Sequence, residues 1–272
     1  MNETATSTLG ILKLFDSHCH LDDRCYRKDF NDMLSRARAA GVVACMVVGI
    51  TPESSQIAAN LADQYEGLYA SVGIHPHDAA HCSEVAIETL RNIAGRTEKV
   101  RAWGETGLDF NRMFSPQADQ EKWFIRQINE AMALDLPLIF HERDTSGRFL
   151  DILHSEAAGG LKGVVHCFSG NRKELYAYLD MGLYIGITGV LTIKGRGKAL
   201  RELVTDIPAD RLLIETDAPY LTPTPDRNRV KRNEPAFVKT VFEKLAAVKN
   251  QPQAQLAKTL WGNTCRLFGI DL

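Results

Sequence analysis

The protein is a chain of 272 residues in which 32 lysines and arginines face 34 aspartates and glutamates, a formal charge of −2. Its 44% hydrophobic and 24% charged residues are typical of a globular protein and exclude a disordered, collagenous or coiled-coil chain. The balanced charge gives no overall basic field that would attract nucleic acid, so such a role would have to rest on local charges.

Short apolar runs alternate along the chain with amphipathic stretches of helical length. We predict strands at Leu12–Phe15, Val42–Val48, Leu68–Val72, Val100–Gly104, Leu138–Phe140, Gly163–Val165, Leu183–Gly186 and Leu212–Ile214. We predict helices between them near residues 26–40, 53–65, 83–94, 115–134, 146–156, 171–180 and 197–206, and two more near 235–248 and 252–268.

Strands that alternate with helices indicate a parallel α/β architecture. A doubly wound open sheet is the alternative, but eight strands are the number that a (β/α)8 TIM barrel uses. We therefore predict one barrel domain over residues 1–272, with the last two helices packed outside it.

Three features point to the cytoplasm. The six cysteines form no C-x-x-C pair and no disulfide-framework spacing. The first eight residues lack the basic and apolar regions of a signal peptide. No apolar run approaches the roughly 20 residues of a membrane span, so we expect no membrane association.

Polar residues follow six of the predicted strands. Active sites of TIM barrels lie at the carboxyl ends of the strands, so we expect these residues on one rim. The segments are Asp16-Ser17-His18-Cys19-His20, Gly73-Ile74-His75-Pro76-His77, Gly104-Glu105-Thr106-Gly107-Leu108-Asp109, His141-Glu142-Arg143-Asp144, His166-Cys167-Phe168-Ser169-Gly170 and Glu215-Thr216-Asp217-Ala218-Pro219-Tyr220.

Four imidazoles and two carboxylates in these segments are candidate metal ligands. A lone His-x-His pair is weak evidence, but a ring of buried histidines and acids at a barrel mouth needs a cation. The set is too large for one tetrahedral ion and suits two metals that share a bridging carboxylate. The candidates are His18, His20, Glu105, His141, His166 and Asp217.

Other residues at this rim are candidate substrate contacts. His75 is either a substrate contact or a structural histidine, as is His77. Arg143 could clamp an anionic substrate or pair with Asp144. Arg232 lies in the basic run after the eighth strand, where it could contact a phosphate, although charge runs are usually solvated.

Together the segments resemble the signature blocks of the TatD-type metal-dependent deoxyribonucleases. Two later blocks extend the resemblance over nearly the whole chain, Lys231-Arg232-Asn233-Glu234-Pro235 and Gly262-Asn263-Thr264-Cys265-Arg266-Leu267-Phe268. The sequence departs from the family around Glu142 and Thr145 and at Phe110, where many members carry tyrosine.

The resemblance implies a metal-dependent-hydrolase barrel that binds two divalent metal ions (Mg, Mn or Zn) through the six candidate ligands. It implies hydrolysis of phosphodiester bonds in DNA, as a 3'-5' exonuclease on single-stranded or frayed ends. We expect Glu105 to bridge the ions and Asp217 to accept a proton from the attacking water. His75, Arg143 and Arg232 would orient the phosphate.

Two alternatives remain open at this point. One is an amidohydrolase or lactonase on the same barrel, but those sites commonly carry a carboxylated lysine where this chain has Glu105. The other is a metal-loaded scaffold without turnover, which requires no complete water-activating set.

Overall fold

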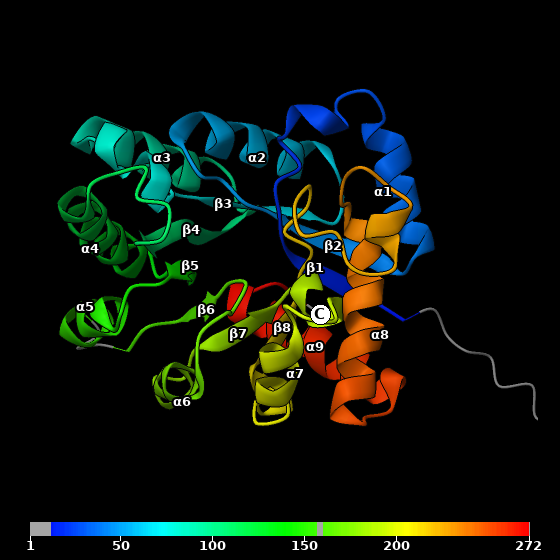
Figure 1. Ribbon diagram of the computed structural model, residues 1–272. Coiled ribbons are helices and arrows are strands. Elements are labelled where there is room, and N and C mark those ends of the chain that lie inside the picture. The colour runs from blue at the N-terminus through cyan, green and yellow to red at the C-terminus, as the bar shows by residue number, and fades with distance from the viewer. Residues whose placement is uncertain (1–11, 157–159, 272) are drawn as a thin grey trace, which may run out of the picture.

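Figure 1 shows the computed structural model of the protein, which describes residues 12–156 and 160–271. Eight strands form one parallel sheet in which each strand pairs with the next along the chain. They are β1 (Leu14–Cys19), β2 (Val42–Val47), β3 (Leu68–Val72), β4 (Val100–Asp109), β5 (Leu138–Arg143), β6 (Gly163–Val165), β7 (Tyr184–Ile187) and β8 (Leu212–Ile214).

The sheet closes on itself where the first strand meets the segment after the last. Cys19 and Ala218 form a parallel bridge. The His20 amide donates to the Ala218 carbonyl at 2.7 Å, and the Asp217 amide donates to the His18 carbonyl at 2.9 Å. The predicted (β/α)8 barrel is confirmed.

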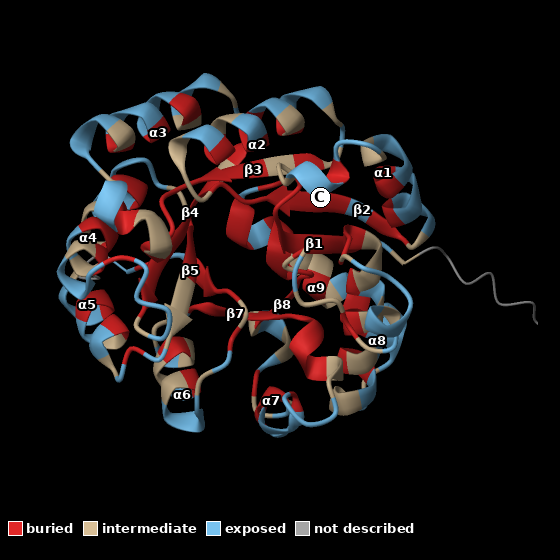
Figure 2. Ribbon diagram, turned by 45° about the horizontal axis from the view of Figure 1, so that its top comes forward, coloured by how far each residue is buried: buried red, intermediate tan, exposed pale blue. Residues whose placement is uncertain are grey.

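Helices surround the barrel and turn their apolar faces toward the strands (Figure 2). Local sequence fixes their starts: Thr51 and Ser54 form a capping box on α2, and Asn171 and Glu174 form one on α6. The helices are α1 (Phe30–Ala39), α2 (Pro52–Gln64), α3 (Glu84–Arg96), α4 (Gln117–Ala133), α5 (Arg148–Glu156), α6 (Arg172–Asp180), α7 (Lys198–Val204), α8 (Val238–Lys249) and α9 (Gln253–Phe268).

The sequence predicted that the last helix packs outside the barrel. In the structure, the end of this helix also contributes to the barrel interior. Phe268, at the end of α9, belongs to one buried cluster with inward-facing strand residues such as Phe15, Ala102 and Leu213. The rings of Phe15 and Phe268 lie 6.4 Å apart. The barrel interior needs an apolar floor opposite its polar mouth, and the end of α9 supplies part of it.

Three strands run further than predicted, because β1, β4 and β5 continue into the polar segments. The pairing of β4 with β5 shows why, since Gly107 pairs with His141 and Asp109 with Arg143. Gly107 has φ +150°, and a Cβ there would stand 1.9 Å from the His141 carbonyl oxygen. His18, Glu105 and His141 therefore lie on strand backbone, with a register shift in β4 around Glu105.

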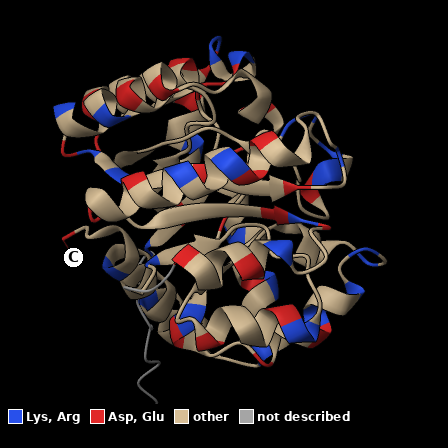
Figure 3. Ribbon diagram, turned by 90° about the vertical axis from the view of Figure 1, so that its left-hand side faces the viewer, with Lys and Arg blue, Asp and Glu red and all other residues tan. Residues whose placement is uncertain are grey.

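On the face in Figure 3, the outer helices carry both acidic and basic residues. Within residues 12–156 and 160–271, no helix is long and apolar enough to cross a membrane. The single-domain prediction covers residues 1–272, of which residues 1–11, 157–159 and 272 lie outside the described part, and it stays a prediction.

Candidate metal centre and active site

The structure brings the six predicted ligands together at the carboxyl ends of the strands. Glu105 lies at the centre of the group and presents its two oxygens to different neighbours. Its Oε2 lies 3.4 Å from His18 Nε2 and 3.8 Å from His20 Nε2. Its Oε1 lies 2.8 Å from His141 Nδ1 and 4.0 Å from His166 Nε2. One carboxylate thus stands between two groups of imidazole nitrogens.

Asp217 approaches the same group from beyond β8. Its Oδ1 lies 3.5 Å from His20 Nε2 and 3.7 Å from the Nε2 atoms of both His18 and His166. Among the described residues, four sets of three offer donor atoms within 4.8 Å of one another, and two of these sets consist of predicted ligands only, which suits two adjacent ion positions. These two sets are His18, His20 and Asp217, and His18, Glu105 and His166.

The partners of the imidazoles fix which nitrogen faces the centre. His20 Nδ1 lies 3.3 Å from the Val48 carbonyl oxygen, which can only accept, so Nδ1 carries the proton and Nε2 has a free lone pair. In the same way, Asp109 faces His141 Nε2 at 3.2 Å and Glu215 faces His166 Nδ1 at 2.9 Å. When a ring is neutral, as a metal ligand must be, its remaining nitrogen presents a lone pair toward the carboxylates of the centre.

This donor set fits divalent cations. The Nε2 atoms of His18 and His20 lie only 3.2 Å apart, and both are buried close to the oxygens of Glu105 and Asp217. Converging lone pairs and carboxylates repel one another in a buried site unless a cation lies between them. Histidine nitrogens and carboxylate oxygens are ligands for zinc and related metals.

The surrounding charges shift the pKa values of the centre. Burial acts to lower the pKa of His141 and of His166, but Asp109 and Glu105 raise that of His141 to about 9, and Glu215 and Asp217 raise that of His166 to about 10. Burial acts to raise the pKa of Glu105, yet the neighbouring imidazoles hold it well below its usual range.

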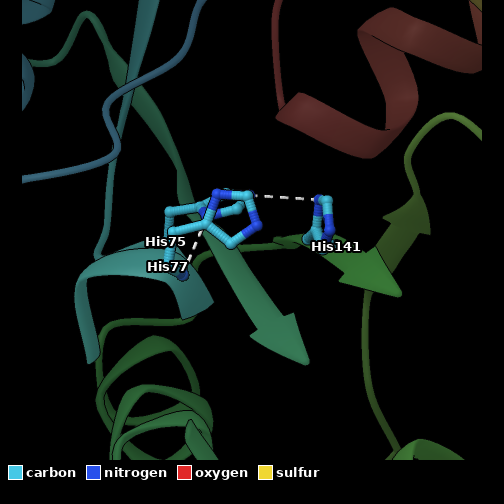
Figure 4. Close-up of side chains that lie close together, drawn as sticks. All are labelled: His75, His77 and His141. Carbon is cyan, nitrogen blue, oxygen red and sulfur yellow. Dashed lines mark hydrogen bonds between the residues drawn. The ribbon is translucent and has the colours of Figure 1, made fainter. Parts of the chain in front are cut away.

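His75 caps the start of the 3-10 helix η2 (Pro76–His81), which contains His77, and both rings lie beside this centre, next to His141 of β5 (Figure 4). His75 Nδ1 accepts the His77 amide proton at 3.0 Å, so the neutral ring carries its own proton on Nε2. This Nε2 lies 3.5 Å from Glu105 Oε1. Burial lowers the pKa of His75 to about 4, so the ring is neutral and can donate a hydrogen bond from Nε2.

Among the buried acids of the quoted segments that were not assigned a role from the sequence, two contact imidazoles at the centre. Asp109 Oδ2 lies 2.8 Å from His77 Nε2, in addition to its contact with His141. Glu215 accepts the Cys167 amide at 2.7 Å. The available signal was a second acid in a segment that already supplied a ligand. Such carboxylates orient the histidines that hold a metal.

The predicted arginine contacts have different positions. Arg143 lines a cavity of about 680 Å³ together with five of the predicted ligands and His75. Arg232 is not part of that lining: its guanidinium pairs with both carboxylate oxygens of Asp29 and lies over the ring of Tyr26. A phosphate contact by Arg232 therefore stays a prediction, and this structure holds the side chain in an ion pair.

Comparisons with known proteins agree with this geometry. An Escherichia fergusonii protein named 3'-5' ssDNA/RNA exonuclease TatD is 40% identical over 261 residues, which cover 95% of this chain and all of that protein. The protein of the same name from Escherichia coli K12 is 40% identical over 260 residues, which cover 94% of this chain and 99% of that one.

Solved structures show the same fold. The crystal structure of the TatD homologue YjjV from Escherichia coli K12 matches with a TM-score of 0.88 and 31% identity, over 96% of this chain and all of that one. A TatD family hydrolase from Entamoeba histolytica matches with a TM-score of 0.85 and 22% identity, over 95% and 99% of the two chains. The family model described as TatD related DNase matches residues 15–269, and the chain belongs to this family.

Proposed function

We propose that the protein is a metal-dependent phosphodiesterase that removes nucleotides from the 3' end of single-stranded DNA or RNA. The observation that carries this proposal is the position of Glu105, whose two oxygens face separate groups of imidazole nitrogens. A carboxylate placed in this way can bridge two metal ions, as in many enzymes that hydrolyse phosphate esters. The names of the relatives supply the substrate and the direction of attack.

We assign the two ions to the six predicted ligands. His18, His20 and Asp217 would hold one ion, His141 and His166 the other, and Glu105 both. Magnesium, manganese or zinc ions at these positions supply positive charge that stabilises the transition state and lowers the pKa of water.

The chain's own groups position the substrate and move protons. Burial acts to raise the pKa of Asp217, but His20, His166 and His18 together lower it, so the carboxylate remains charged at neutral pH. It can therefore accept a proton from the attacking water. His75 Nε2–H donates to a phosphate oxygen, and Arg143 supplies a guanidinium fork to the same group.

The test uses single-stranded oligonucleotides labelled at either the 5' or the 3' end, with Mn²⁺ or Mg²⁺. A 3'-5' exonuclease shortens the 5'-labelled strand one nucleotide at a time and releases the 3' label at once. Bis-p-nitrophenyl phosphate, a lactone and a cyclic amide are compared in parallel. Turnover of the lactone or the amide without cleavage of DNA or RNA would contradict the proposal and identify an amidohydrolase or lactonase.

We further propose that the protein acts in the cytoplasm. All six cysteines are free in the structure, as expected for a protein from a reducing compartment. Fractionation of cells that express the protein, followed by detection with an antibody, tests this location.

A further inference from the structure

Three arginines line the cavity that contains the candidate metal centre. Arg112 follows β4, Arg143 ends β5, and Arg196 lies in the loop between β7 and α7. Of these three, only Arg143 was singled out from the sequence. Residues from three separate β/α units thus bring cationic side chains to one cavity.

No carboxylate oxygen among the described residues lies within ion-pair distance of these three guanidiniums. Other arginines of the protein are engaged, such as Arg91 with Glu130. Exposed arginines such as Arg38 also form no ion pair among the described residues, so it is their place in the cavity lining that distinguishes Arg112, Arg143 and Arg196. A guanidinium without an ion pair can bind a phosphate through two parallel hydrogen bonds without first breaking another contact.

The charge of the cavity supports an anionic ligand once metals are bound. Its lining contains three guanidiniums and six carboxylates, whose charges sum to −3 when the imidazoles are left out. Two divalent cations bound to neutral imidazoles would bring the total to +1. The metal-loaded cavity therefore attracts a polyanion.

We propose that Arg112, Arg143 and Arg196 form an arginine wall that binds backbone phosphates of a single-stranded nucleic acid, so that the strand runs along the β4, β5 and β7 side of the rim. This inference rests on the proposed function and adds the path of the substrate. Guanidinium contacts to phosphates carry no sequence information, so the wall predicts affinity without base preference.

The test measures binding of a 5'-fluorescein oligo(dT) with phosphorothioate linkages, by anisotropy, in Mn²⁺ at 50 to 200 mM salt. For single strands, the slope of log K against log salt is negative, and each lost phosphate contact makes it shallower by about 0.7. Arg112→Ala, Arg143→Ala and Arg196→Ala should each show this loss. Arg38→Ala, on the outer helix α1, is the matched control and should retain the wild-type slope.

Substitution by lysine separates charge from geometry. Arg196→Lys should recover the slope because the charge remains, with an affinity below that of the wild type because the fork is lost. Thermal melting of each variant shows that it is folded. Removal of metal by a chelator should weaken binding in the wild type, and an affinity unchanged by chelation would overturn the charge argument.

Two outcomes distinguish the wall from the proposed function. If the wild type degrades single-stranded DNA while all three alanine variants keep its slope and affinity, the wall is wrong and the function stands. If the wild type binds the oligonucleotide with arginine-dependent salt sensitivity but hydrolyses no phosphodiester, the wall stands and the function is wrong.

Discussion

Glu215 provides a test of how the metal centre is held, because it contacts a predicted ligand without joining the centre. Its Oε1 lies 2.9 Å from His166 Nδ1, and its Oε2 accepts from the Ser17 hydroxyl at 3.4 Å. The residue is only 1% exposed. Glutamine has the same shape but no charge, so Glu215→Gln should leave the fold intact while it weakens the orientation of the His166 ring.

The expected magnitude follows from the role of such carboxylates. Loss of a carboxylate that orients a metal-binding histidine lowers metal affinity by about 10- to 100-fold, or about 1.4 to 2.8 kcal/mol. Metal affinity is measured by competition with a chelating dye. In the metal-free protein, the substitution should also lower the pKa of His166 from about 10, because the negative charge that raises it is gone. An NMR titration of the imidazole reports this change.

A second variant perturbs the same contact while Glu215 remains. A Cβ at Gly186 would stand 2.6 Å from Glu215 Oε1, so Gly186→Ala should displace the carboxylate and also lower metal affinity. Glu243→Gln, an exposed position on α8, is the control for loss of one negative charge. If Glu215→Gln keeps both the metal affinity and the pKa of His166, the carboxylate does not orient the ring.

The remaining predictions concern the metals, the proton acceptor and one arginine. Chelation should abolish hydrolysis and Mn²⁺ or Mg²⁺ should restore it; full activity in protein shown by elemental analysis to hold no metal would contradict the metal-dependent mechanism. Asp217→Asn should lower turnover at least about 100-fold with little change in binding, and wild-type cleavage by a variant that keeps its metals would show that Asp217 is no proton acceptor. Metal loading at pH 7 should release protons from His141 and His166, so calorimetric heats should vary with the ionisation enthalpy of the buffer; heats that do not vary would show that both rings are already neutral. The same protons stabilise the metal-free fold below pH 6.5, and this contribution is lost as pH rises through about 9 and 10. Arg232→Ala should lower the melting temperature through loss of the Asp29 pair, and a shallower salt dependence of DNA binding would support the predicted phosphate contact.

The positions of the strands along the chain were predictable from the sequence. In a parallel barrel both the outward-facing and the inward-facing residues are apolar over most of each strand, so each strand is a short apolar run. The ends of β1, β4 and β5 were missed because the polarity rises where the strands reach the mouth. His18 and Asp109 look like loop residues by composition, yet their backbones still form part of a strand. Polarity therefore marked the start of the site rather than the end of the strand.

The candidate ligands were predictable because metal-binding side chains are rare at regular intervals of one β/α unit. The supporting residues were not, since Asp109 and Glu215 are ordinary acids until the structure shows which imidazole nitrogen each one faces. The position of Arg232 depends on Asp29, which lies 203 residues away in the sequence. Such long-range pairs leave no local pattern.

The closure of the barrel between β1 and the segment after β8, here called the seam, affects where the fold opens locally. The hydrogen bonds that close the barrel there use the backbones of His18, His20 and Asp217, whose side chains converge on the candidate metal centre. A cation held by these side chains would also clamp the two edges of the sheet together. Loss of the ion would then favour local separation of the first and last strands, with amide protons at the seam exchanging with solvent while the rest of the barrel stays closed. The same few residues would thus bind the metal at the active site and hold the barrel closed.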